Sequence, residues 1–297
     1  MRPTVIGIGA QKCASSWVHA ICSTHPEIST SEPKEVDFFS YYFDHGYLWY
    51  ETHFEEQAGA KAYFESSPSY FYDPRSPERA YSYNSDLKVL AMLRDPIKRA
   101  FSNHLHEIVW GHIPPCTFEE GMRVNPVYVD QGRYATHLQR WFDVFPRDQI
   151  KVVIAEDVAK DPYKYAAEIF DFMGVAPDFT SPVFGERRNE SDRPRIPILR
   201  SALRYGGDFM RRHGLEDGLS QLKSFKVVSG ILKANKIEVR DEIPPMRPET
   251  VERLREILRP EVVGLKSLLG RAAPWDGWEE PDKPYEFASR ALSSNER

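Results

Sequence analysis

The chain has 297 residues, 41% of them hydrophobic, and a formal net charge of −5 at pH 7. Such a length suits one large α/β domain or two small ones, and the hydrophobic fraction excludes a mainly disordered chain. Because acidic and basic residues are mixed along a mildly acidic chain, the composition argues against a nucleic-acid partner, which would require clustered Lys and Arg.

In chain order, the hydrophobic pattern alternates between short buried strands and amphipathic helices. Because strands that alternate with helices form βαβ units, we predict a single α/β domain over residues 1–297, with three α/β/α layers around a central parallel sheet. The predicted elements are a strand at 5–8, a helix at 15–23, a strand at 61–65, a helix at 76–83, a strand at 87–93, a helix from Asp95-Pro96 to Trp110, a helix at 133–145, a strand at 150–154 and a helix at 163–172.

The remaining third of the chain has a different character. Residues 181–245 are rich in Arg, Pro and Gly, and we predict an excursion over the domain that would serve as a lid. Its basic run at 193–212 favours a solvated helix face over contact with an anionic glycan or membrane. A last helix is expected at 249–269, interrupted or restarted at Pro260, followed by a loose polar tail at 283–297.

Cysteine content and hydropathy bear on compartment and metals. The chain has three cysteines, Cys13, Cys22 and Cys116. Because this number is odd and their spacing does not match a metal site, we expect neither a disulfide framework nor a metal site. No apolar run approaches the ~18 residues of a membrane span, and the N-terminus does not read as a signal peptide. We therefore expect a cytoplasmic protein, for which peripheral membrane contact and the oligomeric state stay open.

The most specific feature is the strand-to-helix connection at residues 7–17, which reads GIGAQKCASSW. Small residues let backbone amides approach an anion, and a helix N-terminus adds N–H groups with a favourable dipole. Lys12 supplies a positive charge, and two serines supply hydroxyl donors. The pattern predicts a phosphate-binding loop formed by Gln11, Lys12, Cys13, Ala14, Ser15, Ser16 and Trp17.

Two other phosphate-binding patterns fit less well, and a plain strand-to-helix turn is the remaining alternative. A kinase or ATPase loop would have Gly before the Lys and Ser or Thr after it, where this chain has Gln11 and Cys13. A dinucleotide-binding turn would have Gly at the position of Lys12. These departures disfavour an ATP-dependent kinase.

A second anion site is predicted at the end of the strand at 87–93. Arg94 follows that strand at the edge where open parallel sheets bind ligands. Ser102 lies on the next helix, and its side chain leans back toward the same edge. The alternative is that Arg94 pairs with a carboxylate and Ser102 is an ordinary helix residue.

Together the two motifs resemble the family of sulfotransferases that use phosphoadenosine phosphosulfate (PAPS). The similarity runs in order from residue 4 to about 175 and is strongest to the heparan sulfate N- and O-sulfotransferases, of which a bacterial member is expected. The supporting segments are 34–39 (KEVDFF), 49–50 (WY), 65–71 (ESSPSYF), 77–79 (PER), 141–142 (WF), 145–146 (FP), 156–157 (ED) and 161–162 (DP).

The resemblance implies a P-loop-like fold and a set of roles. The loop would hold the 5′-phosphosulfate of PAPS, with Lys12 steadying the leaving oxygen, and Arg94 with Ser102 would hold the 3′-phosphate. Glu35 would be the general base, although without the resemblance it reads as a solvated surface residue. No metal is implied. Acceptor contacts are expected from Ser66, Tyr70 and His106.

The acceptor is left open by departures from the family pattern. Ser66 stands where this branch usually has Lys, and Asp37 stands where it usually has His. A basic loop before the last helix is missing, so that Arg187, Arg188 or Arg240 would have to complete the 3′-phosphate site. We expect sulfonation of a hydroxyl or amine on a saccharide or saccharide-bearing acceptor. The alternatives are a small phenol, alcohol or lipid acceptor and a non-catalytic nucleotide-binding protein.

Two further features of the sequence have an ordinary structural explanation as well as a functional one. The histidines at 104, 106 and 112 suggest a metal site, but no carboxylate falls at ligand spacing, so packing is favoured. The aromatic-rich stretch at 38–54 would stack on a sugar or on an aromatic acceptor, or would form a hydrophobic cluster under a loop.

Overall fold

The centre of the molecule is a five-stranded sheet in which every strand pair is parallel. The computed structural model describes residues 1–186, 192–194, 236–238 and 242–278. The strand order is β2-β3-β1-β4-β5, so β1 lies in the middle and its carboxyl end opens at the centre of the sheet edge. The strands are β1 (Val5–Gly9), β2 (Ile28–Thr30), β3 (Ala62–Ser66), β4 (Lys88–Leu93) and β5 (Ile150–Ile154).

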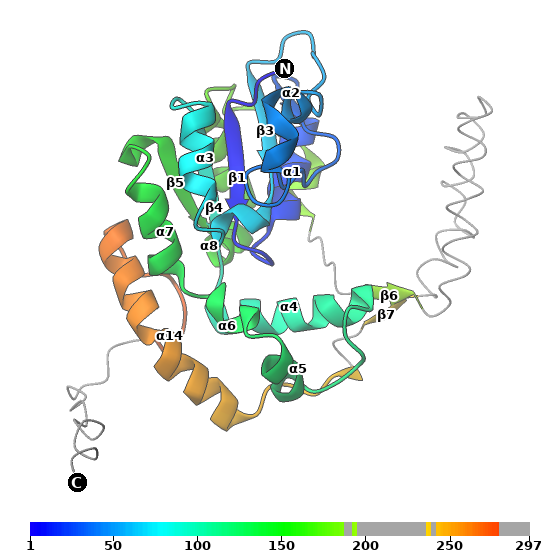
Figure 1. The fold of residues 1–297 in the computed structure, drawn as a ribbon, viewed down its shortest axis with the longest axis vertical. Coiled ribbons are helices and arrows are strands. Elements are labelled where there is room, and N and C mark those ends of the chain that lie inside the picture. The colour runs from blue at the N-terminus through cyan, green and yellow to red at the C-terminus, as the bar shows by residue number, and fades with distance from the viewer. Residues whose placement is uncertain (187–191, 195–235, 239–241, 279–297) are drawn as a thin grey trace.

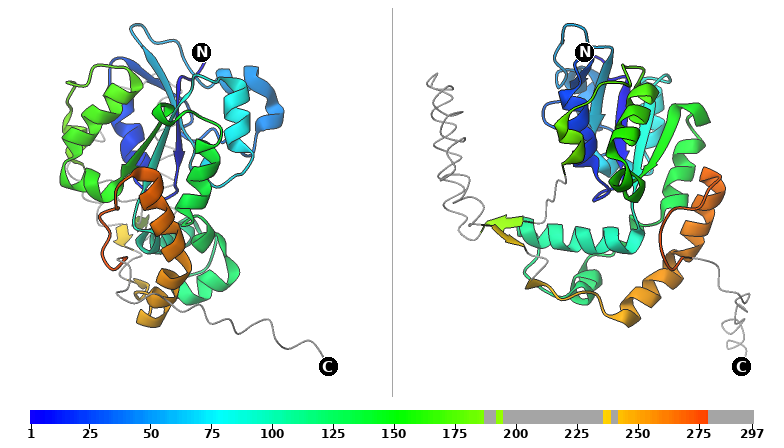
Figure 2. Two further views of the ribbon diagram at one scale, coloured as in Figure 1. Left: turned by 90° about the vertical axis from the view of Figure 1, so that its left-hand side faces the viewer. Right: turned by 180° about the vertical axis from the view of Figure 1, so that it is seen from behind.

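Helices cover both faces of this sheet, which confirms the predicted α/β/α layers (Figure 2). On one face lie α1 (Ser15–Thr24) and α9 (Pro162–Met173), and on the other lie α3 (Ser76–Tyr83) and α7 (Tyr134–Phe142). All five residues of β1 are buried, because a strand covered on both faces carries apolar or small residues throughout.

A further group of helices lies beyond the carboxyl edge of the sheet (Figure 1). There α4 (Pro96–Trp110) runs across that edge, with α5 (Phe118–Val124) and α6 (Val127–Asp130) beside it. The long α14 (Pro248–Leu269) packs on α7 and α4. Shorter elements complete the description, namely α2 (Gly46–Glu51), α8 (Ala155–Lys160), the antiparallel pair β6 (Asp192–Pro194) and β7 (Lys236–Glu238), and the 3₁₀ turns η1 (Phe43–His45), η2 (Pro68–Phe71), η3 (Arg147–Gln149) and η4 (Pro182–Gly185).

The start of α4 follows directly from local sequence. Asp95 caps the helix by accepting hydrogen bonds from Ile97 N (3.0 Å) and Lys98 N (2.8 Å), and Pro96 occupies the first turn. Gly111 ends the helix with a positive φ of 75°, a conformation that glycine adopts without strain. The predicted bounds of α4 are confirmed.

Two helix predictions were wrong in detail. Helix α7 ends at Phe142 rather than at residue 145, because Phe145 precedes Pro146 and the residue before proline avoids the helical region. Helix α14 runs through Pro260 without interruption. Its buried residues Leu258 and Glu261 flank the proline and hold that face against the domain, which compensates for the missing hydrogen bond.

Several predictions lie outside the described residues. These are most of the excursion at 181–245 with its basic run, the tail at 283–297, and the three arginines considered for the 3′-phosphate site, Arg187, Arg188 and Arg240. Among the helices of the described residues, none combines the length and the apolar character needed to cross a membrane.

Candidate active site

The loop after β1 has an unusual backbone. Lys12 and Ala14 have positive φ values of 66° and 70°, and Gly9 has a φ of 103°. A backbone of this kind is typical of the nests in which successive N–H groups bind an anion. Gly9 also has no room for a side chain, because a Cβ there would lie 2.9 Å from the Cα of Pro68.

The beginning of α1 also suits an anion. The first intrahelical bonds of α1 run from the amides of Trp17 (3.0 Å) and Val18 (3.2 Å) to the carbonyl of Ala14. The amides of the preceding loop residues therefore stand outside the helix ladder. The N-cap residue Ala14 provides no side-chain cap. An anion is the natural partner for such a helix end.

Two of the predicted loop residues turn their side chains into the core. Cys13 is fully buried, its Sγ lies 3.7 Å from the Tyr134 hydroxyl, and burial raises the pKa of its thiol to about 11. The Trp17 indole is also buried and donates to the carbonyl of Phe184 at 2.9 Å. Any contact of Cys13 or Trp17 with an anion would therefore come from their backbone.

Tyr134 connects the loop to the predicted second anion site at Arg94. Its hydroxyl donates to the backbone carbonyl of Arg94 at 2.7 Å and also contacts Cys13, so one side chain touches both motifs. Among the described residues, no carboxylate pairs with the Arg94 guanidinium, and its anion-binding role stays a prediction. Ser102 is mostly buried on α4.

Lys34 brings the predicted base to the loop. Its ammonium donates to Ser16 Oγ at 3.0 Å and pairs with Glu35 Oε1 at 2.9 Å. Glu35 thus lies one side chain away from the predicted phosphate-binding loop at residues 11–17, called the anion loop below, although 46% of its side chain is exposed. Lys34 was not among the predicted site residues, and its position directly before Glu35 is the one signal in the sequence that points to it.

His106 contacts the loop from helix α4. Its Nδ1 lies 3.2 Å from the Lys12 ammonium, so that nitrogen accepts the hydrogen bond when Lys12 is charged. Helix α4 thereby contributes to the same site as the loop. Over the described part of the chain, no three His, Cys, Asp or Glu side chains are grouped as metal ligands would be.

The other two residues predicted to contact the acceptor lie deeper. Ser66 is 2% exposed, and a Cβ built on Gly7 would lie 2.7 Å from its hydroxyl. Tyr70 is fully buried, and its hydroxyl accepts a hydrogen bond from the amide of Phe38 at 2.8 Å. Both side chains are buried, and their acceptor contacts stay predictions.

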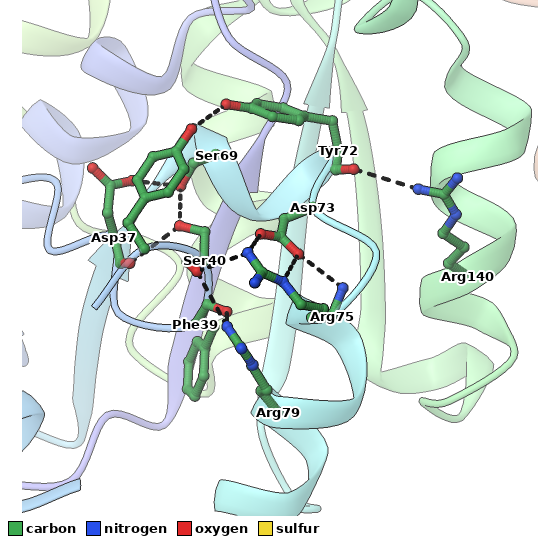
Figure 3. A network of polar contacts seen from close by, with 10 residues as sticks. Asp37, Phe39, Ser40, Ser69, Tyr72, Asp73, Arg75, Arg79 and Arg140 are labelled. Carbon is green, nitrogen blue, oxygen red and sulfur yellow. Dashed lines mark hydrogen bonds and ion pairs between the residues drawn. The ribbon is translucent and has the colours of Figure 1, made fainter. Parts of the chain in front are cut away.

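Asp37, one of the departures from the family pattern, belongs to a polar network (Figure 3). It accepts a hydrogen bond from Ser69, whose hydroxyl also lies 2.7 Å from that of Ser40. Burial raises the pKa of Asp37, and the bond from Ser69 opposes that rise. Nearby, Asp73 pairs with Arg75, so this basic side chain is already partnered.

The aromatic-rich stretch at 38–54 was predicted either to stack on a ligand or to form a hydrophobic cluster, and the structure shows both buried and exposed rings in it. Phe38 and Tyr50 stack in the core at 4.4 Å between ring centroids, with Phe39 against Tyr50. Tyr41 and Tyr42 are 57% and 45% exposed, and Tyr47 is 39% exposed, so these rings are available to a ligand.

The segment after α14 contacts the ends of β4 and β5. The Trp278 indole donates to Asp95 Oδ2 and the Trp275 indole donates to Glu156 Oε2, both at 2.9 Å. Because Asp95 directly follows Arg94, this segment supports the turn that presents the arginine. No local pattern in the sequence predicts these contacts.

Comparison with known proteins agrees with this geometry. The family model described as "Sulfotransferase domain" matches residues 2–189. Human heparan sulfate glucosamine 3-O-sulfotransferase 3A1 is 25% identical over 284 residues, covering 93% of this chain and 63% of that protein. Human bifunctional heparan sulfate N-deacetylase/N-sulfotransferase 3 is 28% identical over 200 residues, covering 60% of this chain and 23% of that protein. The chain therefore spans less than two thirds of these curated relatives.

A solved structure shares the fold. The sulfotransferase from Alicyclobacillus acidocaldarius superposes with a TM-score of 0.67 at 24% identity, covering 92% of this chain and 98% of that one. The five-stranded parallel sheet with helices on both faces is thus the P-loop-like fold that the sequence predicted.

Proposed function

This chain belongs to the sulfotransferase domain family, and we propose that it transfers a sulfuryl group from PAPS to a hydroxyl or amine of an acceptor. The observation that carries the proposal is the Lys34 bridge. A single ammonium joins Ser16 of the anion loop to the Glu35 carboxylate, which supports Glu35 as a base beside a loop that holds the phosphosulfate. This arrangement supports group transfer more than simple nucleotide binding, which needs no base.

The loop and the Arg94 turn are proposed to hold the donor. The nest-like backbone at Lys12 and Ala14 and the start of α1 suit the 5′-phosphosulfate, since both are typical of sites where N–H groups bind an anion. Arg94, with no described carboxylate to neutralise it, and Ser102 suit the 3′-phosphate. Gln11, Cys13, Ser15 and Trp17 would contribute through their backbone or hydroxyl groups.

The proposed reaction is an in-line displacement. PAPS supplies an activated sulfuryl group. The acceptor oxygen or nitrogen forms a bond to sulfur while the bond from sulfur to the phosphate oxygen breaks, and phosphoadenosine phosphate (PAP) leaves. Glu35 takes the acceptor proton, and Lys12 stabilises the charge that grows on the leaving oxygen. Lys34 orients the Glu35 carboxylate before the reaction.

A saccharide or saccharide-bearing acceptor is the proposed substrate class. The support is the similarity to heparan sulfate sulfotransferases together with the exposed tyrosines at 41 and 42, which suit stacking on a sugar. His106 and Ser66 are the proposed acceptor contacts. An acceptor screen that includes phenols, simple alcohols and lipids distinguishes this class from the alternatives.

The experiment to perform first is calorimetric titration with PAP, alongside ATP with magnesium and NAD. We expect tight binding of PAP alone. Lys12→Ala and Arg94→Ala should each weaken it by about 2 kcal/mol or more, because each removes a charged partner of a phosphate. Preference for Mg-ATP, or no PAP binding, would contradict the proposal.

Glu35→Gln separates chemistry from donor binding. Glutamine keeps the shape of the side chain but cannot accept a proton, so turnover should be abolished while PAP affinity stays at the wild-type value. Wild-type turnover in this variant would remove Glu35 as the base, whereas absence of turnover in the wild-type protein despite PAP binding would favour a nucleotide-binding role.

A further inference from the structure

The three residues that follow Glu35 are held in an unusual way. Their consecutive backbone N–H groups all donate to side chains of one other segment, residues 65–70, rather than to backbone carbonyls. The pairs are Val36 N to Glu65 Oε1 at 3.4 Å, Asp37 N to Ser67 Oγ at 2.8 Å, and Phe38 N to Tyr70 Oη at 2.8 Å.

The accepting side chains are themselves fixed. Glu65, Ser67 and Tyr70 are all fully buried. Ser67 donates its hydroxyl to Glu65, and Tyr50 donates to the other Glu65 oxygen at 3.2 Å. A buried N–H that loses its acceptor pays the full desolvation penalty, so each pair holds the backbone at 36–38 firmly.

The other side of this segment is attached to the anion loop. The amide of Ser67 donates to the carbonyl of Gly7 at 2.9 Å, and β1 pairs with β3 at Gly7 and Ser66. Pro68 lies against Gly9 so closely that a Cβ on that glycine would meet its backbone. Residues 65–70 therefore contact both the loop and the segment that carries Glu35.

We propose that Glu65, Ser67 and Tyr70 form a bracket that sets the distance between the Glu35 carboxylate and the anion loop, with Tyr70 as a positioning residue. This inference rests on the proposed function. In-line transfer requires the base, the acceptor and the sulfur to be aligned, and a misplacement near 1 Å can cost about a hundredfold in rate. The bracket provides that alignment through side chains because residues 36–38 are not part of the sheet.

The test compares Tyr70→Phe with Tyr83→Phe. Both changes remove one hydroxyl from a ring of the same aromatic cluster, since Tyr70 and Tyr83 both contact Phe39. The Tyr83 hydroxyl instead donates to Glu51 at 3.0 Å. The pair is therefore matched in chemistry and surroundings, and only one member touches the backbone that follows Glu35.

We expect Tyr70→Phe to lower kcat about tenfold to a hundredfold, while the KM for the acceptor and the affinity for PAP stay within about twofold of wild type. Tyr83→Phe should keep kcat within about twofold. Ser67→Ala, which removes the acceptor of the Asp37 amide, should act like Tyr70→Phe and replaces it as the test if that variant does not fold.

A second readout does not depend on activity. Hydrogen exchange at the amides of residues 36–38 should accelerate in Tyr70→Phe and Ser67→Ala but not in Tyr83→Phe. If wild type transfers no sulfuryl group, the proposed function fails, and the exchange rates still decide whether the bracket exists. Equal losses of kcat in Tyr70→Phe and Tyr83→Phe, unchanged exchange, or a raised acceptor KM at unchanged kcat would overturn the inference, the last by making Tyr70 a substrate contact.

Discussion

At the residue scale, Glu65 shows how burial changes what a carboxyl group does. The side chain is fully buried, and desolvation raises its pKa from 4.5 to about 8, against the opposing hydrogen bond from Ser67. At neutral pH the protonated form prevails, which removes the cost of a buried charge and leaves the carbonyl oxygen as an acceptor for the Val36 amide.

This shift predicts a pH-dependent stability. Because the folded-state pKa exceeds that of an exposed carboxyl, the contribution of Glu65 is fully present below about pH 4.5 and is lost as pH rises through about 8. Glu65→Gln should flatten the decline in unfolding free energy between about pH 5 and about pH 8 by on the order of a few kcal/mol. Urea titrations at the two pH values measure this.

Glu27→Gln is the control for that measurement. The hydrogen bond from Lys61 lowers the pKa of Glu27, so its contribution is present above the ordinary pKa and changes only at lower pH. The variant should therefore keep the wild-type difference between the two pH values. An unchanged slope in Glu65→Gln would show that Glu65 is ionised in the folded protein.

At the element scale, the carboxylate of Asp95 accepts hydrogen bonds both from the start of α4 and from the segment after α14. One oxygen accepts from the first-turn amides of Ile97 and Lys98, and the other accepts from the Trp278 indole. A cap that is shared in this way couples a local helix signal to a contact distant in sequence. The beginning of α4 is readable from the sequence, whereas the partner of the second oxygen is not.

Two caps in this chain can be compared directly. Asp95→Ala should destabilise the protein by about 2–4 kcal/mol, since it removes the cap and leaves a buried indole N–H unpaired. Thr117→Ala removes the capping box of α5, which has no such second contact, and should cost about 1 kcal/mol. Equal losses in urea unfolding would mean that the Trp278 bond adds nothing.

At the scale of the whole molecule, the described end of the chain returns to the carboxyl edge of the sheet. Arg271 pairs with Asp157, and the two tryptophans reach Glu156 and Asp95. These contacts join α14 to the turn that carries Arg94. Donor binding and overall stability should therefore depend on residues far from the anion loop in sequence.

The double variant Trp275→Phe with Trp278→Phe tests this coupling. It keeps aromatic packing but removes two indole hydrogen bonds to carboxylates, so the Tm should fall by roughly 5 °C or more and PAP affinity should decrease. Trp110→Phe is the control, because Trp110 is 67% exposed and should shift neither quantity. A lower Tm with unchanged PAP affinity would show that the segment stabilises the fold without supporting the Arg94 turn.

The sequence by itself determined the α/β layers, the position of the strand-to-helix loop after β1, the Asp95 cap and the family resemblance. Each rests on signals between residues close in the chain: alternating periods, small residues after a strand, and a capping residue before proline. The three-residue β2 was missed because so short a strand carries no period. The predicted interruption of α14 at Pro260 was wrong because packing of the α14 face compensates for one lost hydrogen bond.

Only the tertiary structure decided which side chains meet. The bridge from Lys34 to Ser16, the contact of His106 with Lys12, and the hydrogen bond from the Phe38 amide to Tyr70 all join segments on different elements. Parallel strands bring their carboxyl ends to one edge, but the residues that touch there depend on loop conformation and packing, which no local pattern encodes.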